Sequence, residues 1–560
     1  MGIGFGIVDQ DKGPDHCRTT ARPRIDGAPN QVLTDTMRRW VMGLLLGLAA
    51  LAGGCALPPL DGRSVSVAVL PDTTTTLGRE VAPMLGAHPG KTGVVALKTG
   101  HEGFAARVHL ADIAERSLDL QYYIWHADLT GTLLMDAVLR AADRGVRVRL
   151  LLDDDNTAGM DAQIARLDAH PNIEVRLYNP FVVRGARWWG YLTNLNRLNH
   201  RMHNKSFTAD GWVTIMGGRN IGNEYFNANK DASFVDLDVM VVGNVVSAVA
   251  SEFDRYWASD SAYPAHLVLP PAPSTPLPSV DPVDASEYLN ALEEDSAVLA
   301  LKERRFAPEW VPARLIVDDP RKTSGGAPHS GTIRQRFTAA MGEPKRQTFI
   351  VSPYFVPSRI GAEGLVELAR GGVDTRVLTN SFASSDVAVV HAGYVKYRHE
   401  LLRGGVRLFE LRPDPEALSL ADPLRYREPD EAGSAQSAGK RRWIAGSMRA
   451  SLHAKTSQVD RERVYVGSFN FDPRSMEINT EMGLVIESPF LAIDMAQEFE
   501  RGAKQASYEV KLNAQDQLVW IEPPADGQGP PRVMQTEPGT TLLQRVLLHM
   551  LSWLPIEWLL

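Results

Sequence analysis

The chain has 560 residues, a hydrophobic fraction of 44%, a charged fraction of 22% and a formal net charge of −8. This composition is typical of folded globular proteins, and the length predicts two domains with appendages. The acidic balance argues against a nucleic-acid partner, because proteins that bind nucleic-acid phosphates usually carry net positive charge. Cys17 and Cys55 are the only cysteines, so neither a disulfide framework nor a cysteine-rich metal site is expected.

Residues 1–36 are polar, contain glycine and proline, and look like no export signal. An export signal should begin at an initiator methionine. Met37 is therefore the expected start, and residues 1–36 are expected to be a disordered or non-native extension.

Residues 37–55 are predicted to be an export signal. Two arginines follow Met37, an uncharged apolar run occupies residues 40–52, and two glycines precede Cys55. A cysteine in this place resembles the lipobox of bacterial lipoproteins, in which it is acylated and becomes the mature N-terminus. This predicts a membrane-associated protein of the bacterial cell envelope, lipid-anchored at Cys55. The alternative is an uncleaved anchor, but the run is shorter than the ~20 residues that span a bilayer.

From about residue 94 the pattern alternates between strands and helices. Residues 118–125 carry the aromatic and branched side chains of a strand, and residues 131–144 have helical spacing. Residues 146–152 form the next strand, which ends in an acidic loop at residues 153–155. This loop is read as a strand end and not as a metal site, because metal carboxylates usually come from several elements. The pattern predicts parallel strands in an α/β domain.

The same order of elements returns in the second half of the chain. Residues 348–355 read as a strand, residues 362–370 as a helix and residues 374–378 as the next strand. Each unit then leads to one copy of the motif described below. We interpret this order as an internal duplication.

These patterns divide the chain into seven segments. They are the extension 1–36, the signal 37–55, an N-terminal segment 56–93, a first domain 94–262, a proline-rich linker and strap 263–330, a second domain 331–530 and an amphipathic helix 531–560. The apolar stripe of the last segment is compatible with packing on the second domain or with lying in a membrane interface.

One motif, His-x-Lys-x4-Asp followed by glycine and asparagine, occurs twice at identical spacing. The copies are His203, Lys205, Asp210, Gly217 and Asn220, and His453, Lys455, Asp460, Gly467 and Asn470. In a strand, residues two apart share a face, so each histidine and lysine point into one site. Each asparagine returns on the following strand. Two facing half-sites would place one imidazole on each side of a phosphorus atom, as in-line displacement requires.

These motifs resemble those of the phospholipase D superfamily. The wider stretches Met202 to Lys205, 217–226 and 467–470 resemble bacterial cardiolipin synthases of the C type. The resemblance runs from about residue 56 to the C-terminus. It implies an α/β fold with two pseudo-twofold-related phospholipase D-like domains, each a mixed, largely parallel β-sheet flanked by helices. The domains would share one active site within a monomer, and the superfamily reaction needs neither cofactor nor metal.

The resemblance also implies a covalent mechanism. One histidine attacks phosphorus and forms a phosphatidyl-histidine, and the other protonates the leaving alcohol and later deprotonates the incoming one. In the family the N-terminal histidine, here His203, is usually the nucleophile; the sequence leaves the order open. The two lysines and two asparagines would hold phosphate oxygens, with support from Ser468. Gly218 stands where the superfamily more often has serine, which removes one hydroxyl donor.

The carboxylates are expected to have different roles. Asp210 and Asp460 lie at odd spacing from the histidines, on the opposite strand face, and are predicted to be structural. Each imidazole still needs a partner for its second nitrogen. The family uses a later acidic residue, for which Glu481 is the candidate in the second half. Asp236 is the candidate in the first half, and Asp238 is its competitor.

The predicted function is a phosphatidyltransferase that makes cardiolipin from phosphatidylglycerol and a second phospholipid, either phosphatidylethanolamine or another phosphatidylglycerol. The predicted partners are these lipids and the membrane surface, without nucleic acid. A hydrolytic phospholipase D and, less favoured, a superfamily nuclease are the alternatives. Asp386, His391 and Tyr394 follow a second-half strand, and ligands gather at strand carboxyl ends, so they are candidate acceptor contacts.

Overall fold

The computed structural model describes Met42 and residues 57–229, 232–274, 280–295, 298–299, 308–325, 332–385, 387–413, 449–524 and 529–553. The chain divides into two units, Met1–Ala56 and Leu57–Leu560. The predicted extension, signal and lipidation site Cys55 lie outside the described residues, except that Met42 is helical and exposed. None of the described helices combines the length and apolarity needed to cross a membrane.

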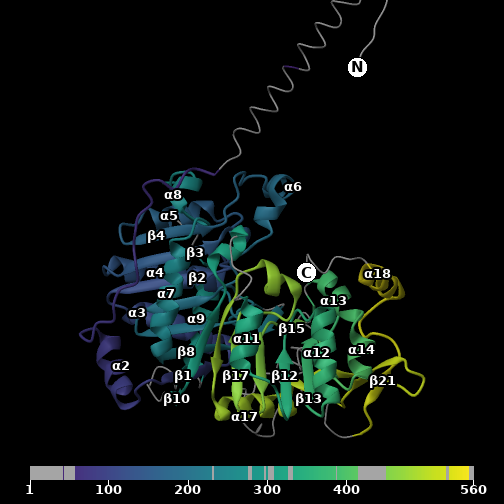
Figure 1. Cartoon of the computed structure of the whole chain (residues 1–560). Coiled ribbons are helices and arrows are strands. Elements are labelled where there is room, and N and C mark those ends of the chain that lie inside the picture. Colours follow the sequence, from purple (N-terminus) through teal and green to yellow (C-terminus); the bar gives the residue numbers. More distant parts are fainter. Residues whose placement is uncertain are drawn as a thin grey trace, which may run out of the picture. The chain divides into compact units, whose positions relative to one another are not determined.

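The first half of unit Leu57–Leu560 is built on one sheet (Figure 1). Its strands, in spatial order, are β10 (Glu309–Val311), β1 (Thr92–Leu97), β8 (Asp238–Gly243), β6 (Val213–Gly217), β5 (Ser206–Ala209), β2 (Ser117–Tyr122), β3 (Arg147–Asp153), β4 (Ile173–Tyr178) and β9 (Ala262–Pro264). The accompanying helices are α2 (Thr76–Ala87), α3 (Gly100–Ile113), α4 (Leu129–Asp143), η1 (Asp154–Asn156), α5 (Asp161–Asp168), α6 (Arg187–Leu198), α7 (Asn244–Trp257), α8 (Ala265–Val268) and α9 (Pro282–Glu294).

The second half repeats this plan. Its strands, in spatial order, are β11 (Ala313–Val317), β18 (Met482–Ile486), β17 (Arg463–Gly467), β16 (Thr456–Val459), β12 (Gln347–Val351), β13 (Asp374–Asn380), β14 (Arg407–Leu411), β19 (Ser507–Leu512), β20 (Leu518–Glu522) and β21 (Arg532–Met534). The helical segments are η2 (Pro320–Ser324), α11 (Ile333–Met341), α12 (Ser358–Arg370), α13 (Ala388–Val395), α14 (Arg398–Arg403), η3 (Arg474–Ile478), α17 (Pro489–Glu498), η4 (Phe499–Ala503) and α18 (Leu542–Ser552).

Parallel pairing joins only β2, β3 and β4 in the first sheet and β12, β13 and β14 in the second. The other paired strands of these sheets, among the described residues, are antiparallel. The prediction of two mixed sheets with flanking helices is confirmed, but the prediction that they are largely parallel is wrong. The strand–helix–strand units supply just three strands to each sheet. The motif-bearing strands are joined by tight hairpins, which require antiparallel pairing.

The internal duplication is visible in the strand order. The series β8-β6-β5-β2-β3-β4 recurs as β18-β17-β16-β12-β13-β14. The halves are also joined to one another, because β7 (Ala232–Val235) of the first pairs in parallel with β15 (Arg449–Leu452) of the second. One buried apolar cluster contains Val239 and Val241 from β8 together with Val464 and Leu484 from the second sheet. The two halves therefore share part of their core.

Two tight hairpins explain the position of the motif aspartates. Asp210 and Gly211 connect β5 to β6 with φ values of 50° and 68°, and Asp460 and Arg461 connect β16 to β17 with 54° and 58°. Two successive residues with positive φ form the turn that matches strand twist, and Asp-Gly is a favoured pair for it. The turn reverses the chain so that the asparagine of each motif returns toward its histidine.

Candidate functional site

Each histidine motif is held by the backbone of the opposite half. The His203 N–H donates to the Thr480 carbonyl at 2.9 Å, and the His453 N–H donates to the Val235 carbonyl at 2.8 Å. The residues that follow these two carbonyls are Glu481 and Asp236. The duplicated fold thus brings one carboxylate from each half to the histidine of the other.

The two imidazoles are paired with these carboxylates. His203 Nδ1 lies 2.9 Å from Glu481 Oε2, and His453 Nδ1 lies 2.5 Å from Asp236 Oδ2. Both carboxylates are buried, and 10% of each imidazole side chain is exposed. A carboxylate partner keeps the proton on Nδ1 and leaves Nε2 for chemistry. Asp238, the competitor of Asp236, instead pairs with Arg107 at 2.8 Å.

The two lysines lie beside the histidine that precedes them. Lys205 Nζ donates to the His203 carbonyl at 2.6 Å, and Lys455 Nζ lies 3.0 Å from His453 Nε2. Both lysines are buried. Burial lowers the pKa of Lys205 to about 7, and a phosphodiester beside it would favour its ammonium form. Two buried lysines next to two imidazoles make the centre suited to such an anion.

The two asparagines differ in their bonding. The Asn220 carboxamide accepts from the Ile124 N–H at 3.2 Å and donates to the Tyr225 hydroxyl at 3.0 Å. It therefore fixes the end of the β2 segment to the wall of the site. The Asn470 Oδ1 is buried and, within the described part of the chain, accepts no hydrogen bond.

Gly218 and Ser468 occupy equivalent places in the two half-sites. The Ser468 hydroxyl donates to Glu481 and accepts from the Met482 N–H at 3.0 Å. At Gly218 an added Cβ would lie 2.1 Å from Asp236 Oδ1. In the structure both positions support the carboxylates: Ser468 binds Glu481, and Gly218 leaves the space that Asp236 fills. Their support of phosphate stays a prediction.

Burial and charge make the two half-sites electrostatically different. Burial, aided by Lys205 and Lys455, lowers the pKa of His203 well below its usual value. Burial and Lys455 lower the pKa of His453, while Asp236 opposes this shift. Burial raises the pKa of Glu481 to about 7. Burial acts in the same sense on Asp236, but His453 and Lys455 outweigh it and hold its pKa at about 2. His453 therefore faces a carboxylate that is ionised throughout the neutral range, and His203 faces one that titrates within it.

This difference predicts an acid limb in the pH profile. Glu481 becomes a carboxylate, able to hold the Nδ1 proton of His203, only above its pKa of about 7. We expect kcat/KM of the native chain to rise with pH on the acid side of about 7. It should fall above that pH as Lys205, whose pKa burial lowers to about 7, loses its charge. Glu481→Gln is neutral at every pH, so it should be slower and should lose this rise. Initial rates over about pH 5 to 9 measure both profiles; an unchanged limb in the glutamine variant would contradict the assignment.

Aromatic rings form walls around both histidines. The Phe234 ring stacks on His453 at 5.0 Å between centroids, and Tyr225 meets the same imidazole edge-on at 5.0 Å. Tyr123 lies edge-on to His203 at 4.9 Å. Sequence reasoning did not identify Tyr225 or Phe234, and it placed Tyr123 only within the strand predicted at residues 118–125. Tyr225 lies within the stretch 217–226 that carried the resemblance, whereas Phe234 had no local signal because it packs on a residue of the other half.

The strand-end aspartates fix the approach to His203. Asp153 accepts from the Met202 N–H at 2.8 Å and lies 3.4 Å from Nη1 of the Arg201 guanidinium. Asp154 pairs with Arg184 at 2.6 Å. These contacts give the acidic loop a structural role in positioning the segment that carries the first motif.

The motif aspartates contact backbone rather than the site. The Asp210 carboxylate accepts from the N–H groups of Glu115, Arg116 and Ser117, the last at 2.9 Å. The Asp460 carboxylate accepts likewise from Lys345, Arg346 and Gln347. Each aspartate therefore ties its hairpin turn to the start of the adjacent strand, β2 or β12.

The candidate acceptor residues require a correction. Asp386 lies outside the described residues. His391 and Tyr394 are buried, His391 Nε2 lies 2.6 Å from Glu537, and the Tyr394 hydroxyl donates to Glu410 at 3.1 Å. These two side chains point into an ion network of the second half instead of lining the centre. Their position after a strand placed these residues near a strand end. It could not show in which direction the side chains of the helix point.

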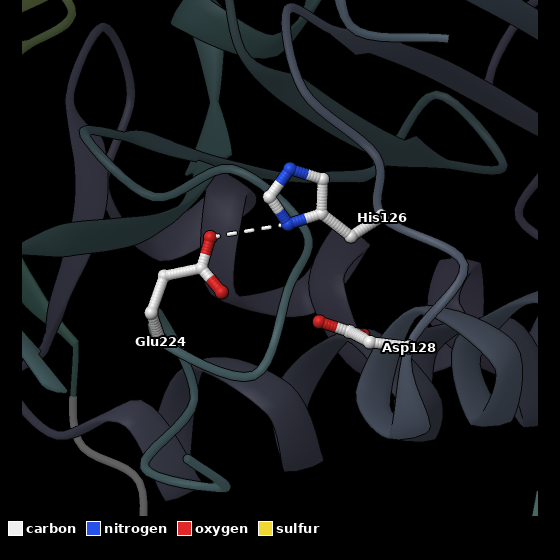
Figure 2. Close-up of side chains that lie close together, drawn as sticks. All are labelled: His126, Asp128 and Glu224. Atoms are coloured by element: carbon white, nitrogen blue, oxygen red, sulfur yellow. Dashed lines mark ion pairs between the residues drawn. The ribbon is translucent and has the colours of Figure 1, made fainter. Parts of the chain in front are cut away.

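A second polar cluster is formed by His126, Asp128 and Glu224 (Figure 2). Glu224 directly precedes Tyr225, which contacts His453. Ligand atoms of His126, Asp128 and Glu224 lie within 4.8 Å of one another. His126 Nδ1 lies 3.2 Å from Glu224 Oε1. Asp128 caps α4 by accepting from the Gly131 N–H at 3.0 Å and also accepts from the Asn223 N–H at 2.7 Å. An ion pair beside a helix cap accounts for these three side chains.

Known proteins match this arrangement. The family model described as "Cardiolipin synthase, PLD-like domain" matches residues 108–257 and 337–502, which contain the two histidine motifs. Cardiolipin synthase C of Escherichia coli is 44% identical over 491 residues, covering 86% of this chain and 99% of that protein. The chain belongs to the PLD-like cardiolipin synthase family. The resemblance inferred from the motifs is thereby confirmed.

Other members of the family are more distant. An uncharacterised protein of Helicobacter pylori is 30% identical over 80% of this chain and 86% of its own length. Cardiolipin synthase 1 of Bacillus anthracis is 24% identical, over 81% of this chain and 73% of its own. The crystal structure of a phosphatidylserine synthase from Haemophilus influenzae superposes with a TM-score of 0.50 at 13% identity, covering 77% of this chain and 92% of that one. This last likeness supports the duplicated fold.

Proposed function

We propose that this chain is a phosphatidyltransferase that makes cardiolipin from phosphatidylglycerol and a second phospholipid through a phosphatidyl-histidine. The crossed pair of histidine–carboxylate contacts is the observation that carries the proposal. It provides two oriented imidazoles around one buried, positively charged centre. The chain covers almost the full length of the E. coli protein named cardiolipin synthase C, which supports the same reaction here.

In the first step, Nε2 of His203 attacks phosphorus. The N–P bond forms, the bond from phosphorus to the departing alcohol breaks, and His453 gives that oxygen its proton. In the second step, His453 takes the proton of the acceptor hydroxyl, a new O–P bond forms and the N–P bond breaks. Lys205 and Lys455 stabilise the added charge on phosphate oxygens.

The electrostatic difference between the half-sites supports this order of roles. A nucleophile must be neutral, and the pKa of His203 is lowered well below its usual value. A general acid must carry a proton at the moment of bond cleavage. Burial and Lys455 lower the pKa of His453 too, but the ionised Asp236 opposes this shift, so His453 is easier to protonate than His203. The donor is phosphatidylethanolamine or a second phosphatidylglycerol.

We further propose a monomer in the bacterial cell envelope, lipid-anchored at Cys55 after removal of residues 37–54. Each half of the single chain contributes one motif and one carboxylate to the shared centre, which supports a monomer as the functional form. Mass spectrometry of the mature N-terminus tests the anchor, since an unmodified Cys55 would refute it.

The function is tested by incubating the purified chain with labelled phosphatidylglycerol, with and without phosphatidylethanolamine, and identifying the lipid products. Cardiolipin is the expected product. Its appearance with phosphatidylglycerol alone, or only with phosphatidylethanolamine present, identifies the donor. Phosphatidic acid as the sole product would show that water is the acceptor and would overturn the synthase proposal.

A further inference from the structure

Helix α6 presents an apolar face to solvent. Trp188 and Leu192 are 64% and 72% exposed, and Trp189 and Leu195 are exposed beside them. Helix α6 is kinked at Asn194, and Leu195 follows the kink. Four large exposed apolar side chains within this short segment are more than the scattered exposure usual on a soluble surface. Tryptophan in particular favours the boundary between water and lipid.

Helix α18 has the same property. Its exposed apolar side chains, with that of the residue after it, are Leu542, Leu543, Val546, Leu547, Met550 and Trp553. Leu543 is 78% exposed and Trp553 is 77% exposed. The helix begins with a capping box between Thr541 and Gln544, so its start is well defined. The sequence left two possibilities for this helix. It packs on α13 of the second half through a face that includes the buried Leu548, and the apolar stripe itself stays exposed.

Neither helix contains an acidic residue, although the chain as a whole has a net charge of −8. Residues 180–203, which include α6, have no aspartate or glutamate. Of their four arginines, Arg201 is buried and Arg184 and Arg187 pair with Asp154, whereas the partly exposed Arg197 bonds to the Asn179 side chain and the Pro180 carbonyl. Helix α18 contains Arg545 and His549. The preceding Glu537 is buried and paired with Arg398 at 2.6 Å, so it adds no exposed negative charge. Apolar faces flanked by basic residues suit a surface of anionic lipid.

Helix α6 is connected to the catalytic centre through Asp155. The Tyr191 hydroxyl of α6 donates to Asp155, and the Tyr123 hydroxyl donates to the same carboxylate at 3.3 Å. Tyr123 in turn contacts the His203 imidazole. The helix also lies in the connection from β4 to the first motif. It therefore stands at the carboxyl edge of the first sheet, next to His203.

Helix α18 reaches the corresponding edge of the second sheet. It packs against α13, which follows β13 in the chain. The last residue of β13, Asn380, exchanges hydrogen bonds of 2.8 and 3.0 Å with the backbone of Leu452, the residue before His453. The two apolar helices thus belong to the strand edges from which the two histidines emerge. Figure 1 shows α6 on the first half and α18 beside α13 on the second.

We propose that α6 and α18 together form a docking surface for an anionic phospholipid bilayer and hold the catalytic centre at the lipid interface. This inference rests on the proposed function, because a phosphatidyltransferase must take both lipids from a membrane. Two separated contacts on one rigid unit bind a surface more tightly than either contact alone. Two contacts also fix the orientation of the protein relative to the bilayer, which a single flexible lipid anchor does not do.

The test uses the full chain in vesicles of phosphatidylcholine and phosphatidylglycerol. In a background with Cys17→Ser and Cys55→Ser, which has no other cysteine, Leu192→Cys, Leu543→Cys and, as a matched control, Phe490→Cys are each labelled with an environment-sensitive fluorophore. Phe490 is 73% exposed and lies in α17, which follows β18 and not one of the parallel strands. Labels at 192 and 543 should shift to shorter emission wavelengths and be quenched by lipids that carry spin labels on their acyl chains. The label at 490 should show neither effect.

Several results would overturn the proposal. Equal quenching at all three positions would mean that the surface is not specific, and no quenching at 192 or 543 would mean that it does not touch lipid. A spectral shift without lipid quenching would assign the surface to a second copy of the chain. Omitting phosphatidylglycerol should reduce quenching, and an unchanged signal would refute the charge argument. A His203→Ala background should leave quenching intact, so failed chemistry and failed docking are distinguishable.

A kinetic readout connects docking to turnover. Trp188→Ser with Leu192→Ser should raise KM for vesicle lipid by about tenfold, because two large apolar side chains no longer leave water on binding. In detergent micelles the same variant should retain native kcat. A Phe490→Ser control should be unchanged on both substrates. Equal loss of kcat on both by the α6 variant would indicate damage to the catalytic centre and would refute the proposal.

Discussion

His203→Ala should lower the rate of phosphatidyl transfer by about 10⁴-fold or more, the scale found when the nucleophile of a covalent mechanism is removed. The imidazole is the group that forms the bond to phosphorus, and the neighbouring Lys205 is directed to the backbone carbonyl of His203. The product assay with labelled phosphatidylglycerol measures the loss. His266→Ala, at a side chain that is 66% exposed, is the matched control and should keep native activity.

His453→Ala should fail in a different and diagnostic way. On natural lipids it should lose activity to a similar extent, because neither the leaving alcohol nor the acceptor has a proton partner. A phosphatidyl ester of a nitrophenol leaves without protonation, so this variant should still form the covalent adduct and should release it slowly. Mass spectrometry should find the adduct on His203. An adduct on His453 in the His203→Ala variant would reverse the proposed roles.

The sequence could predict the chemistry because the motif is local. The spacing of two residues between His203 and Lys205 determines a shared strand face, and the odd spacing of Asp210 removes it from that face. The contacts of Asp210 with three backbone N–H groups at the start of β2 agree with that reasoning. The order of strands and helices along the chain also predicted the internal duplication. The matching strand order of the two sheets confirms it.

Contacts between the halves could not be predicted in this way. Glu481 lies 278 residues after His203, and Asp236 lies 217 residues before His453. The family's use of a later acidic residue suggested both carboxylates but not which histidine each one serves. The prediction that the sheets are largely parallel was wrong for a related reason. The helix-linked strands were easy to recognise, whereas strands such as β11 and β18 pair across long sequence separations.

Gly218→Ser should lower kcat by about 10²- to 10³-fold, although serine is the commoner residue at this place in the resembling superfamily. The new Cβ would lie 2.1 Å from Asp236 Oδ1 in the present arrangement, so the carboxylate must leave its position. His453 would then lose the partner that orients Nδ1, and loss of such a partner in a hydrolase triad costs up to about 10⁴-fold. The measurement is kcat in micelles, with thermal unfolding as a check on folding.

Ser468→Gly is the matched change in the other half-site. It removes the hydroxyl that donates to Glu481 but leaves the carboxylate in place, 2.9 Å from His203. Loss of one hydrogen bond to a charged group corresponds to about tenfold to 100-fold in rate. The effect should therefore be smaller than that of Gly218→Ser.

The decisive variant combines Gly218→Ser with Asp236→Glu. Together these changes copy the Ser468–Glu481 pair into the first half-site, where the longer carboxylate can accept from the new hydroxyl. Activity should recover to well above that of Gly218→Ser alone, and Asp236→Glu alone should also be impaired. Such non-additivity is the signature of residues in direct contact. Additive losses would mean that Gly218 and Asp236 act independently and that the glycine is needed for another reason, such as direct access of phosphate to the backbone.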